Sequence, residues 1–259
     1  MMTTPIAYLN SPALKAAVLA EITTHEAQGA VIKGITGAYG RMNETFTGCA
    51  IGCTLHSLNV LQGKTGAALT DAINQHARYP VELGWPLWLA HLEDVVFEHL
   101  PDALATTWPR RLAEAIPVGA SVDDLVLAKI LRWMLADAES GVRAATTDAR
   151  VQENIDVIVA MFDAEIATGG QATAEQREAA AVAAWDARDA PGPPGTAWTA
   201  WTAWTARDAG DAGWDAWPAR AAWAAARAAG DAGAAKADAF FPGLSHQILH
   251  VLREDEDAT

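Results

Sequence analysis

The residues with the greatest chemical capacity gather in one stretch of the chain, residues 34–57. Its sequence is GITGAYGRMNETFTGCAIGCTLHS, which holds two cysteines, a histidine and five glycines. Cys49, Cys53 and His56 follow one another at i, i+4 and i+7, so in a helix all three lie on one face. A glycine-rich loop that leads into a helix N-terminus also suits an anion, because free N–H groups and the helix dipole point there. The five glycines also indicate backbone that bends where a Cβ would clash, or that approaches another group closely. The stretch therefore predicts the location of a site.

A metal centre is one interpretation of the two cysteines. Two thiolates and an imidazole suit Zn²⁺, and three residues could complete its four ligands: His76, His91 and Glu93. A helix rises about 10 Å over seven residues, so Cys49 and His56 are too far apart to share one ion easily. Only Cys49 with Cys53, or Cys53 with His56, could do so. We expect neither a metal nor another cofactor.

A nucleophilic cysteine is the second interpretation. Cys49 near a helix N-terminus would have a lowered pKa, and a nearby histidine could hold its proton. However, His56 lies two turns further along the same helix and reaches Cys49 poorly. Cys53 can contact His56, but it lies deeper in the helix, where the effect of the dipole fades. The third interpretation is that both cysteines are small buried hydrophobic residues, as free cysteines often are.

A binding pocket without catalysis is the interpretation that we favour. Tyrosine and basic side chains of the loop can contact a ring and a phosphate, and polar groups of the helix can form hydrogen bonds. Glu93 and Asp94 suit ribose hydroxyls or a base amine, although carboxylates on such helices are often only solvated. The predicted ligand-binding residues are Lys33, Tyr39, Arg41, Cys49, Thr54, His56, Ser57, Arg78, Tyr79, Glu93 and Asp94, with Arg110 and Arg111 as an alternative second basic wall.

Charge and composition limit the partners. The chain has 259 residues and a formal net charge of −14, which argues against nonspecific nucleic-acid binding because that needs a basic surface. No apolar run approaches the roughly 18 residues that span a bilayer, and no basic region precedes an apolar block at the start. Two cysteines on one short helix favour a reducing compartment. We therefore expect a soluble cytoplasmic protein that binds neither nucleic acid nor membranes.

Helix signals recur along most of the chain and predict an all-α fold. Ser11-Pro12, Trp85-Pro86 and Trp108-Pro109 are each typical of a helix start, since proline suits the first helical turn. Amphipathic spacing and caps predict further helices at 49–62, 69–77, 121–134, 151–166 and 173–189. Ser121 with Asp124, and Thr173 with Gln176, resemble capping boxes at two of these starts. Residues 30–35 could be extended, but one such run does not predict a sheet.

The segment PGPPG, residues 191–195, divides the chain, because no helix continues through that density of proline and glycine. We predict one helical core domain at 1–190 and an Ala/Trp-rich helical tail at 196–259. Seven of the eleven tryptophans lie between Trp185 and Trp223, within segments that repeat variations of AWxARDAG. Small residues let helices approach closely and tryptophan fills the gaps. We therefore expect the tail to pack on the core or on a second copy of the chain, as a homo-oligomer.

The segment GCAIGCTLHS, with Gly34, Gly37 and Tyr39 upstream, resembles a motif of uncharacterised phage and prophage proteins. The resemblance extends over LGWP, LAHLEDVVFEHLP, Trp108-Pro109 and AIPVGAS to the Ala-rich tail, so it covers most of the chain. It implies a phage accessory protein in the cytoplasm of an infected bacterium. Phage proteins of this size often counter bacterial defence, and one recurring way is to sequester cyclic nucleotides or ADP-ribose-type signals.

These features together predict a protein that binds and sequesters a small nucleotide-derived anion, without a catalytic residue. Two other classes stay open. One is a cysteine- or metal-dependent hydrolase of a similar ligand. The other is an antagonist that binds another protein through the Ala/Trp-rich tail and has no small-molecule site.

Overall fold

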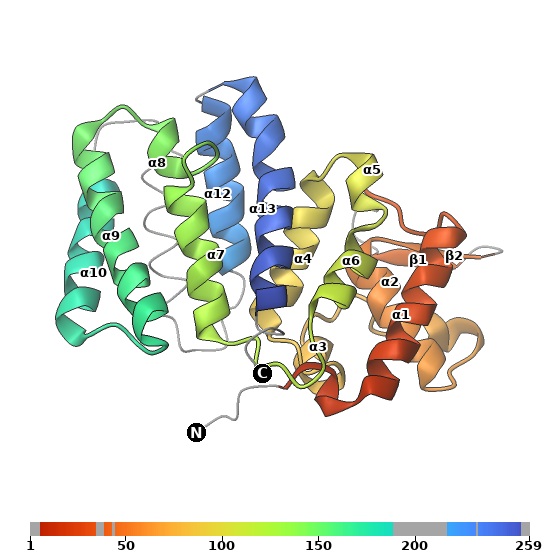
Figure 1. The fold of residues 1–259 in the computed structure, drawn as a ribbon. Helices are drawn as coiled ribbons and strands as arrows, with labels where there is room; N and C mark the ends of the chain where they lie inside the picture. Colours follow the sequence, from red (N-terminus) through yellow and green to blue (C-terminus); the bar gives the residue numbers. More distant parts are fainter. Residues whose placement is uncertain (1–5, 35–38, 43–44, 189–216, 232, 255–259) are drawn as a thin grey trace. The chain divides into compact units, whose positions relative to one another are not determined.

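The computed structural model describes residues 6–34, 39–42, 45–188, 217–231 and 233–254 (Figure 1). The chain divides into two compact units, residues 1–122 with 252–259, and residues 123–251. The all-α prediction is confirmed, since 72% of the chain is helical and the described strands form one two-stranded sheet. Among the described helices, none has the length and apolar character needed to cross a membrane.

The first unit is built around helix α2. Its elements are η1 (Ala7–Asn10), α1 (Pro12–Ala27), β1 (Gly40–Met42), β2 (Phe46–Gly48), α2 (Ala50–Leu61), η2 (Gly66–Thr70), α3 (Arg78–Glu82), α4 (Leu87–His99), α5 (Asp102–Ala105) and α6 (Trp108–Ala115). Residues 50–59 of α2 are all buried, and the helix packs against α1, α4 and α6. Even the polar side chains of α2 are therefore interior groups.

The predicted helix starts in this unit are confirmed. The hydroxyl of Ser11 accepts a hydrogen bond from the Leu14 N–H, and proline occupies the first turn of α1. Helices α4 and α6 begin directly after or at the Trp-Pro pairs, as expected. In each case the signal is local, because the cap and the proline act within one turn of the helix.

A helix predicted over residues 69–77 is wrong. The 3₁₀ turn η2 ends at Thr70, and turns follow it. The Asn59 side chain donates hydrogen bonds to the carbonyls of Leu69 and Asp71 at 2.9 and 3.0 Å. Ala72 has a left-handed φ of 54°. A residue in that conformation ends a right-handed helix, and the captured carbonyls are not free to form one.

A small hairpin lies inside the glycine-rich stretch, where no sheet was expected. Strands β1 and β2 are antiparallel, with Gly40 opposite Gly48 and Arg41 opposite Thr47. Both glycines lie against the Phe46 ring, which a Cβ at either position would approach to within 2.5 and 2.7 Å. Val31 forms a single parallel bridge to Gly48, so residues 30–35 contribute one bridging residue.

The second unit contains longer helices. They are α7 (Asp124–Ala136), α8 (Val142–Ala145), α9 (Ala149–Thr168), α10 (Ala174–Arg188), α12 (Trp217–Asp231) and most of α13 (Ala234–Glu254). The capping box at the start of α10 is confirmed, since Thr173 and Gln176 exchange backbone and side-chain hydrogen bonds. The cap of α7 is Asp123, whose carboxylate accepts from Leu125 and Val126, and is not Ser121.

The described part of the Ala/Trp-rich tail packs inside the second unit. Helix α12 contacts α7 and α8. In α13, the Phe240 ring lies 6.0 Å from the Trp133 ring, and the Lys236 ammonium donates to the Ala144 carbonyl at 3.0 Å. The predicted division at 190–196 falls within this unit, and most of the tryptophan repeats lie outside the described residues.

Candidate functional site

The N-terminus of α2 is occupied by the chain itself. The Cys49 N–H donates to the Tyr39 carbonyl at 3.0 Å, and the Gly52 N–H donates to Cys49 Sγ at 3.5 Å. A Cβ on Gly52 would lie 1.7 Å from the Tyr39 carbonyl oxygen, so only glycine permits this approach. Two N–H groups that were expected to face an anion therefore already have acceptors. The predicted close backbone approach is present, but its partner is Tyr39.

Both cysteines are buried thiols. Cys49 is the N-cap residue of α2, and Cys53 lies one turn further on. The pKa of Cys49 is raised to about 12, chiefly by burial and to a lesser extent by the nearby carboxylates Asp94, Glu98 and Glu93. Burial also raises the pKa of Cys53. The lowered pKa expected from the helix dipole is absent because desolvation outweighs it. The arrangement therefore favours the interpretation of both cysteines as packed residues.

His56 and Ser57 belong to a separate buried cluster. The Ser57 hydroxyl donates to the Cys53 carbonyl at 2.9 Å, so its oxygen accepts from His25 Nδ1, which lies 3.4 Å away. His25 Nε2 then accepts from His56 Nδ1 at 3.0 Å. The ring of His56 stacks on Phe46 with centroids 3.9 Å apart, and its buried Nε2 has no hydrogen-bond partner among the residues that the structure describes. Both histidines are therefore neutral, and the cluster joins α1, α2 and β2.

This histidine pair makes a testable prediction about acid stability. The pKa of His25 is lowered from 6.5 to about 4, chiefly by burial and also by the nearby His56. Between these values the unfolded chain binds a proton that the folded chain excludes. The contribution of His25 to the free energy of unfolding is therefore fully present above pH 6.5. It is lost as the pH falls toward 4, by about 1.4 kcal/mol per pH unit.

Urea unfolding measured across this range checks the prediction. His25→Gln should flatten the slope, and His99→Gln on the exposed end of α4 serves as the matched control. A slope that is the same in His25→Gln and in the wild type would contradict the neutral pair.

A second buried cluster contains polar atoms that lie near one another but form no well-aligned hydrogen bond within the described part of the chain. Thr54 Oγ1, the Tyr79 hydroxyl, Trp85 Nε1 and both carboxyl oxygens of Glu93 are buried without a hydrogen-bond partner among the described residues. The four residues are at most 1% exposed. The Tyr79 and Trp85 rings lie 5.6 Å apart, and Thr54 and Glu93 both adjoin the Tyr79 hydroxyl and perturb its pKa. Three helices and one loop therefore bring unpaired polar groups together.

Burial decides the ionisation of Glu93. Desolvation raises the pKa of its carboxyl from 4.5 to about 8, although the Tyr79 hydroxyl acts in the opposite direction. Its backbone carbonyl accepts from Trp108 Nε1 at 3.2 Å, which holds this turn of α4 in place. At neutral pH the side chain is therefore a neutral acid, with one O–H donor and one carbonyl acceptor.

A partly exposed rim of aromatic and acidic residues adjoins this cluster. His76 Nε2 lies 3.3 Å from an Asp94 oxygen, and its ring stacks on His91 with centroids 4.4 Å apart. Tyr39 packs edge-on against His76, and its pKa is raised by burial and by Asp94. The carboxylates of Asp94 and Glu98 raise the pKa of both Tyr39 and Cys49, and Glu93 also raises that of Cys49. These residues therefore lie in one region of the first unit. We define the rim as Tyr39, His76, His91 and Asp94.

The structure therefore groups some of the predicted site residues and separates others. Five belong to the buried cluster and its rim, Tyr39, Thr54, Tyr79, Glu93 and Asp94, and Cys49 lies beside them. His56 and Ser57 contact His25 instead. Trp85 was not predicted, because Gly84-Trp85-Pro86 indicated only a helix start and nothing local shows that its indole N–H is left unpaired.

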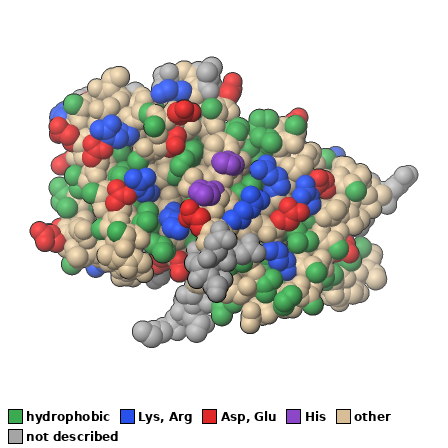
Figure 2. Space-filling view, viewed as in Figure 1, with side chains coloured by type: hydrophobic (Ala, Val, Ile, Leu, Met, Phe, Trp, Pro, Cys, Tyr) green, Lys and Arg blue, Asp and Glu red, His purple; other side chains and the backbone are tan. Residues whose placement is uncertain are grey.

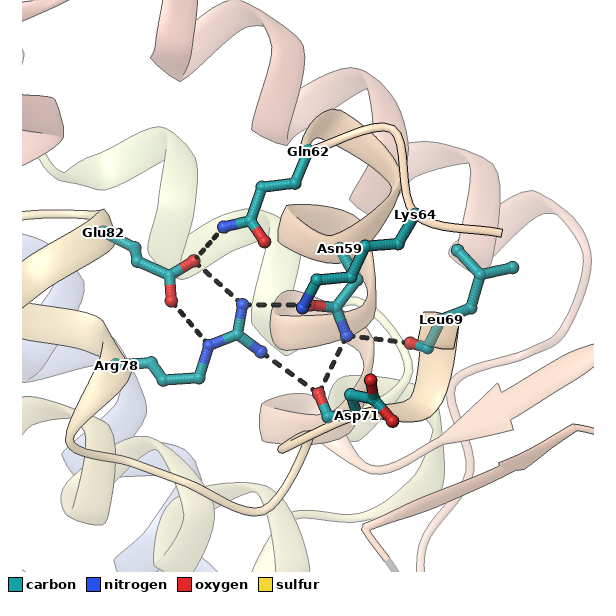
Figure 3. Close-up of polar contacts among 7 residues, drawn as sticks. All are labelled: Asn59, Gln62, Lys64, Leu69, Asp71, Arg78 and Glu82. Atoms are coloured by element: carbon teal, nitrogen blue, oxygen red, sulfur yellow. Dashed lines mark hydrogen bonds and ion pairs between the residues drawn. The ribbon is translucent and has the colours of Figure 1, made fainter. Parts of the chain in front are cut away.

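The predicted basic wall is used within the protein. Arg78 forms two hydrogen bonds to Glu82 at 2.6 and 2.8 Å, and a third to Asn59 Oδ1 at 3.0 Å (Figure 3). Figure 3 also shows Gln62 and Lys64 bound to the same acceptors. This network ties α3 and the η2 turn to α2. Arg110 is likewise paired, with Glu26 and Glu114.

Lys33 and Arg41 differ in their surroundings. Lys33 Nζ donates to the Leu100 carbonyl at 2.6 Å and pairs with Asp102 at 3.3 Å, at one wall of a pocket of about 310 Å³. That pocket is otherwise lined mainly by apolar groups such as Val31 and Phe97. Arg41 is exposed on β1 and forms no ion pair with any described residue. Of the predicted cations, Arg41 and the half-buried Arg111 form no ion pair with a described residue, and Arg41 is the more exposed of the two.

The residues weighed as metal donors are not arranged around a common point among the described residues. Within the described ranges, no group of three or more His, Cys, Asp or Glu side chains could hold a metal ion. His76 stacks on His91 and lies within hydrogen-bond distance of Asp94, so these contacts orient the three side chains.

Comparison with known proteins adds no relative to this picture. No protein-family model, curated protein or solved structure matches the chain. Function must therefore be argued from the geometry of the buried cluster and its rim.

Proposed function

We propose that the first unit binds and sequesters a small nucleotide-derived ligand, whose base or ribose is held by Thr54, Tyr79 and Glu93. The observation that carries this proposal is that all three side chains are buried and lie near one another, yet none forms a well-aligned hydrogen bond with a described residue. Each unpaired buried polar group costs about 1–3 kcal/mol. Three such groups on α2, α3 and α4 support a role in holding another molecule.

The chemistry of the cluster favours an uncharged, hydrogen-bonding part of the ligand. A neutral Glu93 offers a donor beside an acceptor, which complements the amide or amidine edge of a nucleobase. The hydroxyls of Thr54 and Tyr79 can each donate and accept. The charges that perturb Cys49 and Tyr39 come from Asp94 and Glu98, among others, so a phosphate is disfavoured at this depth.

The anionic part of the ligand is assigned to the surface beside the rim. Arg41 follows Tyr39 by two residues and is exposed. A ligand whose base lies against Tyr79 and Glu93 would pass the Tyr39 ring before its phosphate meets Arg41. Charge-assisted contacts of that kind are the stronger hydrogen bonds, so Arg41 should contribute much of the affinity.

Sequestration is favoured over hydrolysis by the state of the thiols. With a pKa raised to about 12, Cys49 is protonated at neutral pH and is a poor nucleophile. The proposal places the protein among phage accessory proteins that remove a nucleotide signal from the infected cell. In that setting the ligand would be released unchanged.

Binding assays with a panel of cyclic nucleotides and ADP-ribose test the proposal. We expect one ligand class to bind by isothermal titration calorimetry and to be recovered intact by mass spectrometry after incubation. Arg41→Ala should weaken that binding by roughly tenfold to a hundredfold, because a charge-assisted contact contributes about 1.5–3 kcal/mol. Arg150→Ala, on α9 of the second unit, is the matched control and should bind as the wild type does.

Three results would contradict the proposal. They are the absence of binding by every compound in the panel, equal affinity of Arg41→Ala and the wild type, and recovery of a cleaved ligand. Mass spectrometry of the purified protein, first native and then denatured, provides an independent check, since a tightly held ligand should be released on denaturation.

A further inference from the structure

A groove lies between α9 and α10 in the second unit. It has a volume of about 510 Å³ and is lined by Asn154, Val157, Glu175, Glu178, Ala179, Val182, Ala183 and Asp186. Val157 and Val182 are 40% and 56% exposed, which is high for valine in a helical protein. In the space-filling view, hydrophobic and charged side chains alternate over this end of the unit (Figure 2).

The sequence of α10 explains why this face is left open. Alanines at 180, 183, 184 and 187 are buried, and they let α10 pack closely on α9. Glu175, Glu178, Val182 and Asp186 follow at intervals of three and four residues, so they share one exposed face. The groove therefore has an apolar floor of valine and alanine, and every charged group that lines it is a carboxylate.

We propose that this groove binds a basic amphipathic helix of a partner protein. Apolar side chains spaced three and four residues apart would pack on Val157 and Val182, as in other helix-in-groove complexes. Lysine or arginine on the flanks would meet Glu175, Glu178 and Asp186. Residues 175–186 extend about 16 Å along α10, so three turns of a partner helix would fill the groove.

Charge selects this partner over the two nearest alternatives. The tryptophan-rich segment that follows α10, residues 189–216, carries four aspartates and one arginine. The carboxylates that line the groove would therefore repel it. A second copy of the chain has a net charge of −14, so the carboxylates of the groove would repel it as well. A basic helix instead gains attraction at long range and apolar burial at contact.

A fluorescent peptide of leucine and lysine provides the test. The probe has about 18 residues with leucine on one helical face, and its counterpart has glutamate in place of lysine. We expect the lysine peptide to bind the full-length protein by fluorescence anisotropy and the glutamate peptide not to bind. Val182→Asp should weaken binding at least tenfold, and Glu175→Gln with Glu178→Gln should reduce its salt dependence. Glu153→Gln, on α9 outside the groove, is the control.

The same variants separate the alternatives. Equal binding of the lysine peptide to Val182→Asp and to the wild type would overturn the proposal, as would no binding at all. It would also be overturned if Val182→Asp, without peptide, changes tryptophan fluorescence and lowers the melting temperature, because the chain's own segment would then fill the groove. A wild-type dimer that Val182→Asp dissociates in sedimentation would point to a second copy and overturn it too.

Discussion

Glu93→Gln is expected to raise the free energy of unfolding by about 3 kcal/mol at pH 7. The wild-type carboxyl stays neutral in the folded protein, where its pKa is about 8, but ionises in the unfolded chain with a pKa of 4.5. Each unit between the pH and the unfolded value favours unfolding by about 1.4 kcal/mol. Glutamine is neutral in both states and removes this penalty.

The sign of the pH dependence makes the result specific. The contribution of Glu93 to stability is fully present below pH 4.5 and is lost as pH rises to about 8. The difference between Glu93→Gln and the wild type should therefore vanish near pH 4 and grow with pH. Chemical denaturation at several pH values measures it, with Glu21→Gln on α1 as the control. A glutamine variant that is no more stable than the wild type at pH 7 would refute the neutral acid.

Ligand binding by Glu93 variants connects this result to the proposed function. Glutamine keeps a donor beside an acceptor, so Glu93→Gln should bind the ligand within a few-fold of the wild type. Glu93→Leu removes both groups and should abolish binding while the fold is retained. If the leucine variant binds normally, the buried cluster does not hold the ligand.

Gly52→Ala is expected to destabilise the first unit by about 3 kcal/mol or more. The new Cβ would lie 1.7 Å from the Tyr39 carbonyl, which is backbone and also accepts the Cys49 N–H. Either α2 or the segment at Tyr39 must move, and overpacking of this kind typically costs about 1–3 kcal/mol even where side chains can adjust. Because Tyr39 belongs to the rim, ligand binding should be lost as well.

The direction of this effect is diagnostic. Without a close neighbour, alanine in a helix is more stable than glycine by about 1 kcal/mol. A stabilised Gly52→Ala variant would therefore show that Tyr39 does not approach α2. Gly170→Ala, after α9, is the control, since its Cβ would meet only the Thr168 hydroxyl at 3.9 Å. Thermal and urea unfolding of both variants complete the comparison.

The amino-acid sequence by itself determined the helical architecture and many helix starts. Ser11 caps α1, the Trp-Pro pairs begin α4 and α6, and Thr173 with Gln176 caps α10. These signals act within one turn, so they can be recognised without knowing the neighbours. The concentration of glycine also located the region where backbone approaches α2 closely, although it did not identify Tyr39 as the partner.

Only the tertiary structure decided the protonation states and the interaction partners of the site residues. An arginine such as Arg78 can bind a phosphate, but its guanidinium already donates hydrogen bonds to Glu82 and Asn59. Asn59 lies on another helix, so the sequence around Arg78 does not reveal this contact. Cys49 begins a helix as expected, yet burial among carboxylates raises its pKa instead of lowering it. In the sequence, Glu93 cannot be distinguished from a solvated carboxylate. It is neutral because it is buried where α2, α3 and α4 pack together, which raises its pKa. Desolvation and long-range pairing depend on the assembled neighbours, and for that reason no local pattern reveals them.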